Sequence, residues 1–121
     1  MKPRIKICCI SSVEEAQMAA SFGAAALGLV GRMPSGPGPI ADELIAMIVK
    51  TIPPPIASFL LTSETIASDI VAHQQRVNSN TIQMVDALEE RAYKIIKQQL
   101  PAIKLVQVIH VVDDSSVDEA L

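Results

Sequence analysis

Apolar residues in this chain form five short, nearly continuous runs, separated by longer stretches with helical spacing. The runs, which predict strands, cover residues 5–10, 24–30, 56–62, 81–85 and 102–112. Between them, apolar residues recur every three or four positions, as on the buried face of an amphipathic helix. The pattern predicts strict alternation of strands and helices, and residues 113–121 start one more helix.

Turn and capping residues mark the expected helix boundaries. The serines at positions 11–12 each precede a glutamate by three residues, which is a capping-box pattern, and Gly23 lies where a helix C-terminal glycine is expected. Ser63 is expected to cap the third helix, and Asp86 with Glu89 to open the fourth. The first, third and fourth helices are therefore expected to begin at capping residues.

Alternating apolar strands and helices are typical of an α/β protein with a parallel sheet covered by helices. Two folds fit: an open doubly wound sheet, or a (β/α)₈ TIM barrel. The doubly wound fold is disfavoured because "CISSVEE" follows the first strand, where a phosphate-binding glycine signature would lie. A complete barrel needs roughly 200 residues. The 121-residue chain supplies about four and a half units, so residues 1–121 are predicted to be one domain, a truncated, partial barrel.

Composition excludes several classes of function. The net charge of −3 and the lack of a basic cluster argue against nucleic-acid binding. No run approaches the ~18 uncharged apolar residues of a membrane span. The two cysteines, Cys8 and Cys9, are adjacent, and neighbours rarely meet disulfide geometry. Reduced thiols indicate a cytoplasmic protein.

Strand alternation gives the two cysteines different surroundings. It places Lys6, Cys8 and Ile10 on one face of the first strand, which we interpret as the inner face. The other face, expected to pack under a helix, carries Ile5, Ile7 and Cys9. Cys8 then lies near the strand's carboxyl end, which is the end that carries active sites in barrels.

The stretch "IKICCISSVEEAQMAASFGAAALGLV" resembles the start of the phosphoribosylanthranilate isomerase family, tryptophan-biosynthesis enzymes with a (β/α)₈ barrel. That family begins Lys-hydrophobic-Cys-Gly-hydrophobic-Thr, as residues 6–11 do with two changes. It continues Gly-Ala-Asp-Ala-hydrophobic-Gly-Phe-hydrophobic, to which residues 23–30 are similar. "PPPIASFLLTSETI" and "TIQMVD" are similar to its third strand and its Val-Gln-Leu-His-Gly strand.

The resemblance implies an isomerase that performs an Amadori rearrangement of N-(5-phosphoribosyl)anthranilate, a phosphorylated small molecule. This reaction needs an acid to open the sugar ring and a base to take the proton from C2, but no metal and no organic cofactor. Cys8 is the expected general base, and Lys6 and Arg32 are candidate substrate-binding residues. An ammonium group near Cys8 would favour the thiolate by lowering its pKa from ~8.5 towards neutrality.

Several positions depart from the family pattern. Cys9 replaces its glycine, Val85 replaces its histidine, and "PSGPGPI" lacks its substrate-binding arginine. The family's acid and phosphate loops come from later strands. We therefore expect the isolated chain to be inactive, and to self-associate or bind a missing C-terminal half-barrel. The alternative is a degenerate, non-catalytic half-barrel that acts as a structural or assembly module.

The two histidines are expected to have no chemical role. His73 lies in the polar helical stretch "AHQQR", which predicts a surface position. His110 lies near the carboxyl end of the fifth predicted strand, at the same parity as Lys104, and is interpreted as a structural histidine with satisfied hydrogen bonds.

Overall fold

The computed structural model describes residues 2–121 and contains one parallel sheet whose strands lie in chain order. The strands are β1 (Lys6–Ile7), β2 (Ala26–Val30), β3 (Ala57–Thr62), β4 (Thr81–Met84) and β5 (Lys104–Gln107). The helices are α1 (Val13–Ser21), α2 (Asp42–Thr51), α3 (Ala67–Val77), α4 (Glu90–Gln99) and α5 (Ser115–Ala120). The predicted alternation is confirmed, although β5 is shorter than the apolar run 102–112.

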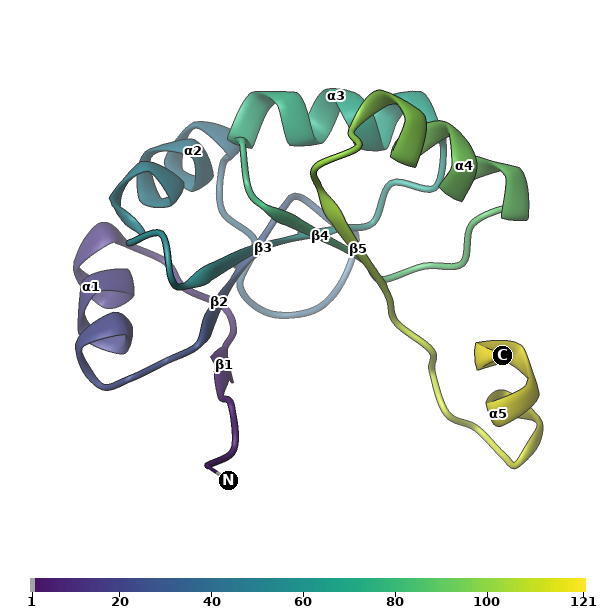
Figure 1. Ribbon diagram of the computed structural model, residues 1–121, viewed down its shortest axis with the longest axis horizontal. Helices are drawn as coiled ribbons and strands as arrows, with labels where there is room; N and C mark the ends of the chain where they lie inside the picture. The colour runs from purple at the N-terminus through teal and green to yellow at the C-terminus, as the bar shows by residue number, and fades with distance from the viewer. Residues whose placement is uncertain (1) are drawn as a thin grey trace.

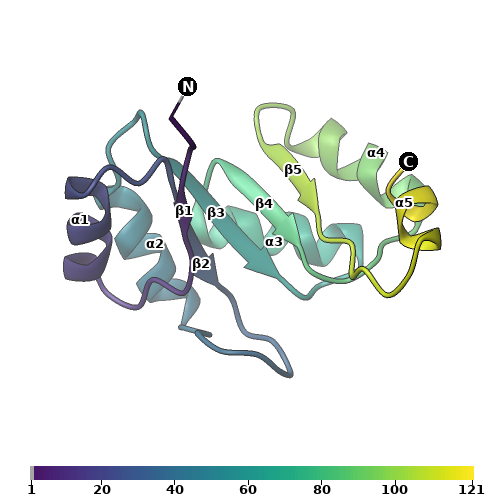
Figure 2. The same ribbon diagram turned by 90° about the horizontal axis from the view of Figure 1, so that it is seen from below.

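The sheet curls into an arch, and α1 to α4 cover only its convex side (Figure 1). Seen from below, the concave side is open, and β1 and β5 lie at its two edges (Figure 2). A doubly wound sheet would reverse its strand order at a switch point and carry helices on both faces. The sequential order β1-β2-β3-β4-β5 and the single helical layer are instead those of a (β/α)₈ barrel wall. The prediction of a partial barrel is confirmed.

The hydrophobic core lies between the sheet and the helical layer. Side chains on the outer face of the strands pack against the helices in two clusters, which fits the burial expected of parallel strands. The first includes Ile10, Leu27, Leu29, Ile45 and Leu60. The second includes Ile70, Ile82, Met84, Ala92 and Ile96. The inner face is left with the register partners Gly28, Phe59, Thr81 and Lys104.

The hydrogen bonds at the helix starts agree with the capping predicted for α1, but they correct the capping residues predicted for α3 and α4. The Ser12 side chain accepts a hydrogen bond from the Glu15 amide at 3.1 Å, and Gly23 follows α1 with a φ of +94°. Ser63 does not cap α3, because that helix begins four residues later and the Ser63 hydroxyl donates to a loop carbonyl. Asp86 likewise lies too far ahead of α4, whose N-cap has no side-chain hydrogen bond.

The first strand ends sooner than its apolar run predicted, because Cys9 takes a left-handed conformation with a φ of +58°. This turn reverses the alternation of side chains. Ile10, expected on the inner face, is 0% exposed in the core beneath the helices, so that part of the prediction was wrong. Cys9 does not lie between sheet and helix either; its Sγ lies 3.7 Å from the Pro37 carbonyl oxygen in the β2–α2 loop.

Because a side chain in the left-handed region costs about 1–2 kcal/mol, Cys9→Gly is expected to stabilise the fold. The larger conformational entropy of glycine in the unfolded chain offsets part of this gain, which leaves a net increase of roughly 0.5–1 kcal/mol in the free energy of unfolding. Urea unfolding at matched protein concentration measures it. Cys9→Ala, which keeps the Cβ at a φ of +58°, is the control and should give no gain. Equal gains from both variants would contradict this account.

Candidate functional site

Lys6 lies on the concave face of the sheet and reaches from β1 to side chains on β3 and β4. Its Nζ is 2.9 Å from Gln83 Oε1, 5.0 Å from the centroid of the Phe59 ring, and 3.9 Å from Cys8 Sγ. The ammonium group is therefore held by an amide oxygen and an aromatic face while it contacts the thiol. The inward direction predicted for Lys6 agrees with these contacts, but Gln83 and Phe59 were not singled out from the sequence.

Cys8 lies over the inner face at the carboxyl end of β1. A Cβ at Gly28 would lie 2.6 Å from its Sγ, so the thiol occupies the space that a side chain on β2 would fill. Two residues further on, the backbone bonds to β2 again: the Ile10 amide donates to the Gly28 carbonyl at 3.1 Å. Cys8 is a free cysteine with an exposed side chain, so a ligand in solution can reach its thiol.

Cys9 lies in a different environment from its neighbour. Desolvation raises the pKa of the Cys9 thiol, and the adjacent Cys8 raises it further. Its Sγ also lies against Gly38, where a Cβ would come within 2.8 Å. Cys9 therefore packs the β2–α2 loop against the end of β1.

The other sequence candidates lie apart from this thiol–ammonium pair. Arg32 is exposed in the β2–α2 loop at the same carboxyl end, and its backbone carbonyl accepts from Ser63 Oγ at 3.4 Å. His110 is exposed, with Nε2 2.9 Å from the Val85 carbonyl oxygen. Lys104, at the amino end of β5, lines a hollow of about 430 Å³ in the concave face that Lys6 and Phe59 also line, so it shares that hollow with Lys6 but has no contact with the Cys8 thiol. The structure thus brings Lys6 together with Cys8, but not with Arg32.

His73 is buried, which corrects the predicted surface position. Only 4% of the residue is exposed, and its ring contacts Thr62 Oγ1 through Nδ1 at 3.0 Å and Asp42 Oδ1 through Nε2 at 2.8 Å. Arg76 Nε donates to the other Asp42 oxygen at 2.8 Å. Partial burial would raise the pKa of Asp42, but the hydrogen bonds from Arg76 and His73 outweigh it and hold that pKa below its usual range.

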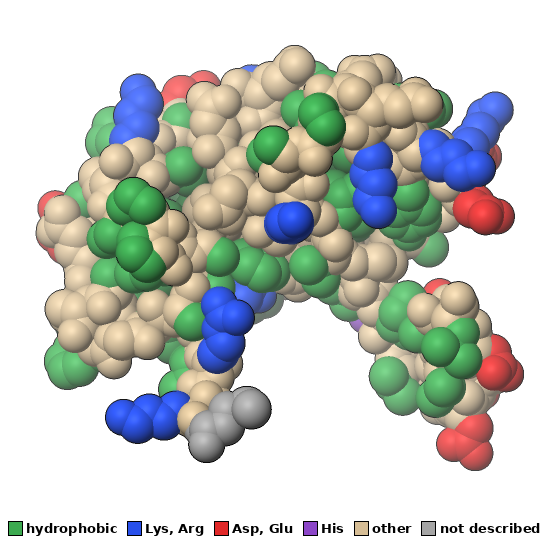
Figure 3. Space-filling view, viewed as in Figure 1, with side chains coloured by type: hydrophobic (Ala, Val, Ile, Leu, Met, Phe, Trp, Pro, Cys, Tyr) green, Lys and Arg blue, Asp and Glu red, His purple; other side chains and the backbone are tan. Residues whose placement is uncertain are grey.

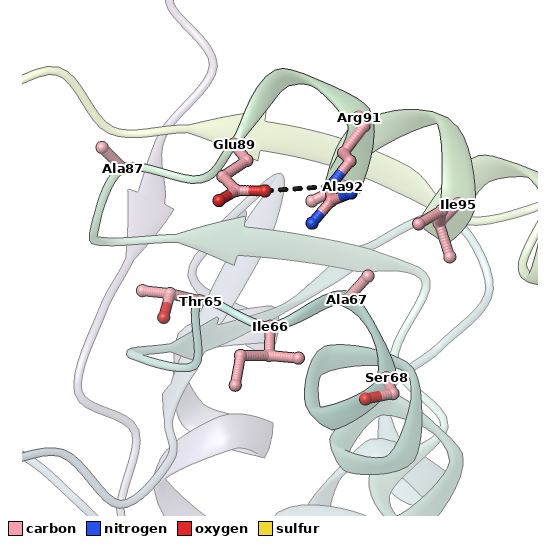
Figure 4. A pocket seen from close by; sticks show the side chains of 9 residues that line it. All are labelled: Thr65, Ile66, Ala67, Ser68, Ala87, Glu89, Arg91, Ala92 and Ile95. Carbon is pink, nitrogen blue, oxygen red and sulfur yellow. Dashed lines mark hydrogen bonds and ion pairs between the residues drawn. The ribbon is translucent and has the colours of Figure 1, made fainter.

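A separate hollow of about 510 Å³ lies between the starts of α3 and α4 (Figure 4). The exposed ion pair between Arg91 Nε and Glu89 Oε2, at 2.9 Å, lies at one side of it, and Ile66 and Ile95 are apolar parts of its lining. It has no thiol, and it lies outside the arch rather than on its concave face. The thiol and the ammonium group that contacts it lie instead at the end of β1.

The described part of the chain, residues 2–121, holds no group of three or more His, Cys, Asp or Glu side chains arranged to hold a metal ion. It also has no helix of the length and apolarity that a membrane crossing requires.

Fold and site together define a class: part of a (β/α)₈-barrel protein with an exposed thiol and an ammonium group on the inner face of its first strand. The chain is similar in sequence to phosphoribosylanthranilate isomerases, which confirms the predicted resemblance. No family model matches it. It is 33% identical over 110 residues to N-(5'-phosphoribosyl)anthranilate isomerase 2 of Methanosarcina mazei, and 26% identical over 117 residues to the corresponding isomerase of Methanocella arvoryzae.

Those alignments cover 90% and 97% of this chain but 49% and 55% of the relatives, so the chain spans about half the length of the curated relatives it matches. Among solved structures, phosphoribosylanthranilate isomerase from Thermotoga maritima superposes with a TM-score of 0.86 at 22% identity, over 98% of this chain and 56% of that one. An isomerase bound to reduced 1-(o-carboxyphenylamino)-1-deoxyribulose 5-phosphate gives the same TM-score. At this identity the structural match establishes the fold alone.

Proposed function

We propose that residues 1–121 are the base-bearing part of a phosphoribosylanthranilate isomerase of tryptophan biosynthesis. Cys8 is the general base, and Lys6 and Arg32 bind the phosphorylated substrate. The free state of both cysteines supports a cytoplasmic location. The observation that carries the proposal is the exposed Cys8 thiol, 3.9 Å from Lys6 Nζ at the carboxyl end of β1.

The reaction divides into two proton transfers, and this chain supplies one of them. Once the sugar ring has opened to leave C1 doubly bonded to nitrogen, the thiolate of Cys8 takes the proton from C2, the electrons of that C–H bond form the C1=C2 double bond, and the C1=N pair moves onto the nitrogen. Lys6 Nζ contacts the thiol, and the hydrogen bond that it donates to Gln83 Oε1 holds the ammonium group in this position. Protonation of the ring oxygen needs an acid, which the resemblance implies comes from a strand later than β5.

A fusion tests the proposal. Residues 1–121 are joined to the remaining, unmatched part of the Methanosarcina mazei relative, and loss of substrate fluorescence is followed for the fusion and for residues 1–121 alone. We expect turnover from the fusion and none from the separate chain, which lacks the acid. Turnover by residues 1–121 alone would contradict this division of the site. A folded but inactive fusion would favour the degenerate half-barrel, an assembly module that keeps the wall and has lost the chemistry.

The open sheet edges support a second proposal, about the partner. Apolar side chains remain exposed beside both edges, and unpaired strand edges favour association. Beside β1 they include Ile5, Ile7, Met18 and Phe22; beyond β5 they include Val111, Val112, Val117 and Leu121. When residues 1–121 are alone, we propose that a second copy covers these edges; in a longer chain, the C-terminal half-barrel does so.

Charge favours pairing between unlike edges of two copies. The segment leading into β1 carries Lys2 and Arg4, whereas the segment after β5 carries Asp113, Asp114, Asp118 and Glu119. The two segments form the opposite feet of the arch, and Figure 3 shows blue side chains at one foot and red ones at the other. The basic segment before β1 of one copy is therefore complementary in charge to the acidic segment after β5 of the other.

A further inference from the structure

The buried imidazole of His73 joins three separate parts of the carboxyl-terminal rim. Through Nε2 it contacts Asp42, the first residue of α2, and through Nδ1 it contacts Thr62, the last residue of β3. Its ring also lies against the backbone of Gly31, just after β2, where a Cβ would come within 2.5 Å of Cε1. An L-residue with a side chain at position 31 would collide with the ring.

The partners of this cluster are consistent with Nε2 as the donor and Nδ1 as the acceptor of the His73 ring. The Asp42 carboxylate only accepts, so Nε2 carries a proton and donates. Thr62 Oγ1 accepts from the Glu64 amide at 3.2 Å and keeps its hydroxyl hydrogen, which can be donated to Nδ1. Every polar group of the imidazole is thereby satisfied while it is buried, as a stable polar cluster requires.

Two of the residues that His73 contacts border the β2–α2 loop. Gly31 starts the β2–α2 loop and Asp42 follows its end, so one side chain touches both ends of the segment that carries Arg32. The Thr62 contact extends to the start of the β3–α3 loop, whose Ser63 hydroxyl donates to the Arg32 carbonyl.

We propose that His73 is a positioning residue that closes the base of the β2–α2 loop and so holds Arg32 at the carboxyl-terminal rim of the barrel. The binding role of Arg32 rests on the proposed function, but the closure of the loop does not. His73 remains buried and touches no substrate itself. It acts through Asp42 on one side of the loop and through the close fit to Gly31 on the other.

Two substitutions of His73 test its hydrogen bonds to Asp42 and to Thr62 separately. In His73→Gln, the side-chain amide nitrogen can replace Nε2 and donate to Asp42, but the acceptor for Thr62 is lost. In His73→Asn, the side-chain oxygen can replace Nδ1 and accept from Thr62, but the donor to Asp42 is lost. The readouts are trypsin cleavage of the Arg32–Met33 bond and hydrogen exchange of the Glu64 amide, both measured on residues 1–121.

We expect His73→Asn to speed cleavage after Arg32 by about tenfold, the factor that corresponds to one buried hydrogen bond, and to leave the Glu64 amide protected. His73→Gln should restore near wild-type cleavage after Arg32 while exchange at Glu64 speeds up. Cleavage after Lys97, on α4, reports global unfolding and is the internal reference. His110→Gln, at the exposed histidine, is the matched control and should change neither readout.

Equal effects of the two His73 variants on both readouts would overturn the proposal, and so would unchanged cleavage after Arg32 in His73→Asn. If neither variant folds, Asp42→Ala removes the same contact from its partly exposed side and should also speed cleavage after Arg32; unchanged cleavage there would equally overturn it. Neither readout depends on turnover, so a failure here is distinguishable from a failure of the isomerase assignment.

Discussion

Replacing Cys8 by serine should lower kcat/KM of the fused barrel by about 10²–10⁴-fold, the usual contribution of a general base. Serine is close to cysteine in size, so the change leaves the packing against Gly28 nearly intact. Its hydroxyl does not ionise near neutral pH, however, and cannot take the C2 proton as a thiolate can. Initial rates of substrate fluorescence loss, measured over a range of substrate concentrations, separate kcat from KM.

The adjacent thiol provides the matched control. Cys9→Ser changes the same atom one residue away, where the thiol faces the β2–α2 loop and desolvation raises its pKa. Its kcat/KM should stay within about threefold of the parent fusion, well below the effect expected of a base. If Cys8→Ser also left the rate unchanged, Cys8 would be a structural thiol and the proposed chemistry would be wrong. A purely larger KM would instead assign Cys8 to substrate binding.

Residues 1–121 alone are expected to form dimers or larger assemblies rather than monomers. Phe22 is 86% exposed and Ile5 55% exposed beside the open β1 edge, and both sheet edges present unpaired backbone groups. Covering this apolar surface is favourable, and parallel edges can extend by pairing with further strands. Light scattering coupled to size exclusion should therefore give a mass that is a multiple of 12.9 kDa.

Two exposed methionines allow a matched comparison. Met18→Glu places a charge in the apolar surface beside β1, whereas Met47→Glu places it on α2, away from both edges; the two residues are 54% and 57% exposed. We expect Met18→Glu to weaken association by about tenfold or more, as a buried unpaired charge does, and Met47→Glu to leave it unchanged. A monodisperse 12.9 kDa species from the unmodified chain, or equal effects of the two variants, would contradict edge pairing.

The fold class could be predicted from the sequence because it depends on local periodicity. Apolar runs of strand length alternate with helical spacing, and a parallel sheet with helices on its outer face buries both patterns. Alternation within the first strand also gave the correct inward direction for Lys6 and Cys8. The same reasoning failed at Ile10, because it assumed an extended backbone through Cys9, and the left-handed turn there exchanges the two faces.

The partners of these side chains could not be predicted, because they depend on register between strands. Gln83 lies 77 residues from Lys6 in the chain, and only the stagger of β1 to β4 brings their polar atoms to 2.9 Å. The same holds for His73, whose polar neighbours in the sequence indicated an exposed helix face. Its burial depends on Asp42 and Thr62, which lie 31 and 11 residues away.

By itself, then, the sequence determined which elements form, their order, and which thiol of the pair faces inward, since each follows from spacing along a single segment. The tertiary structure alone decided that the ammonium group beside Cys8 meets an amide and an aromatic ring, and that a buried imidazole contacts both ends of the β2–α2 loop. Those contacts join segments far apart in the chain, and their geometry is fixed by the curvature and stagger of the sheet, which no local pattern encodes.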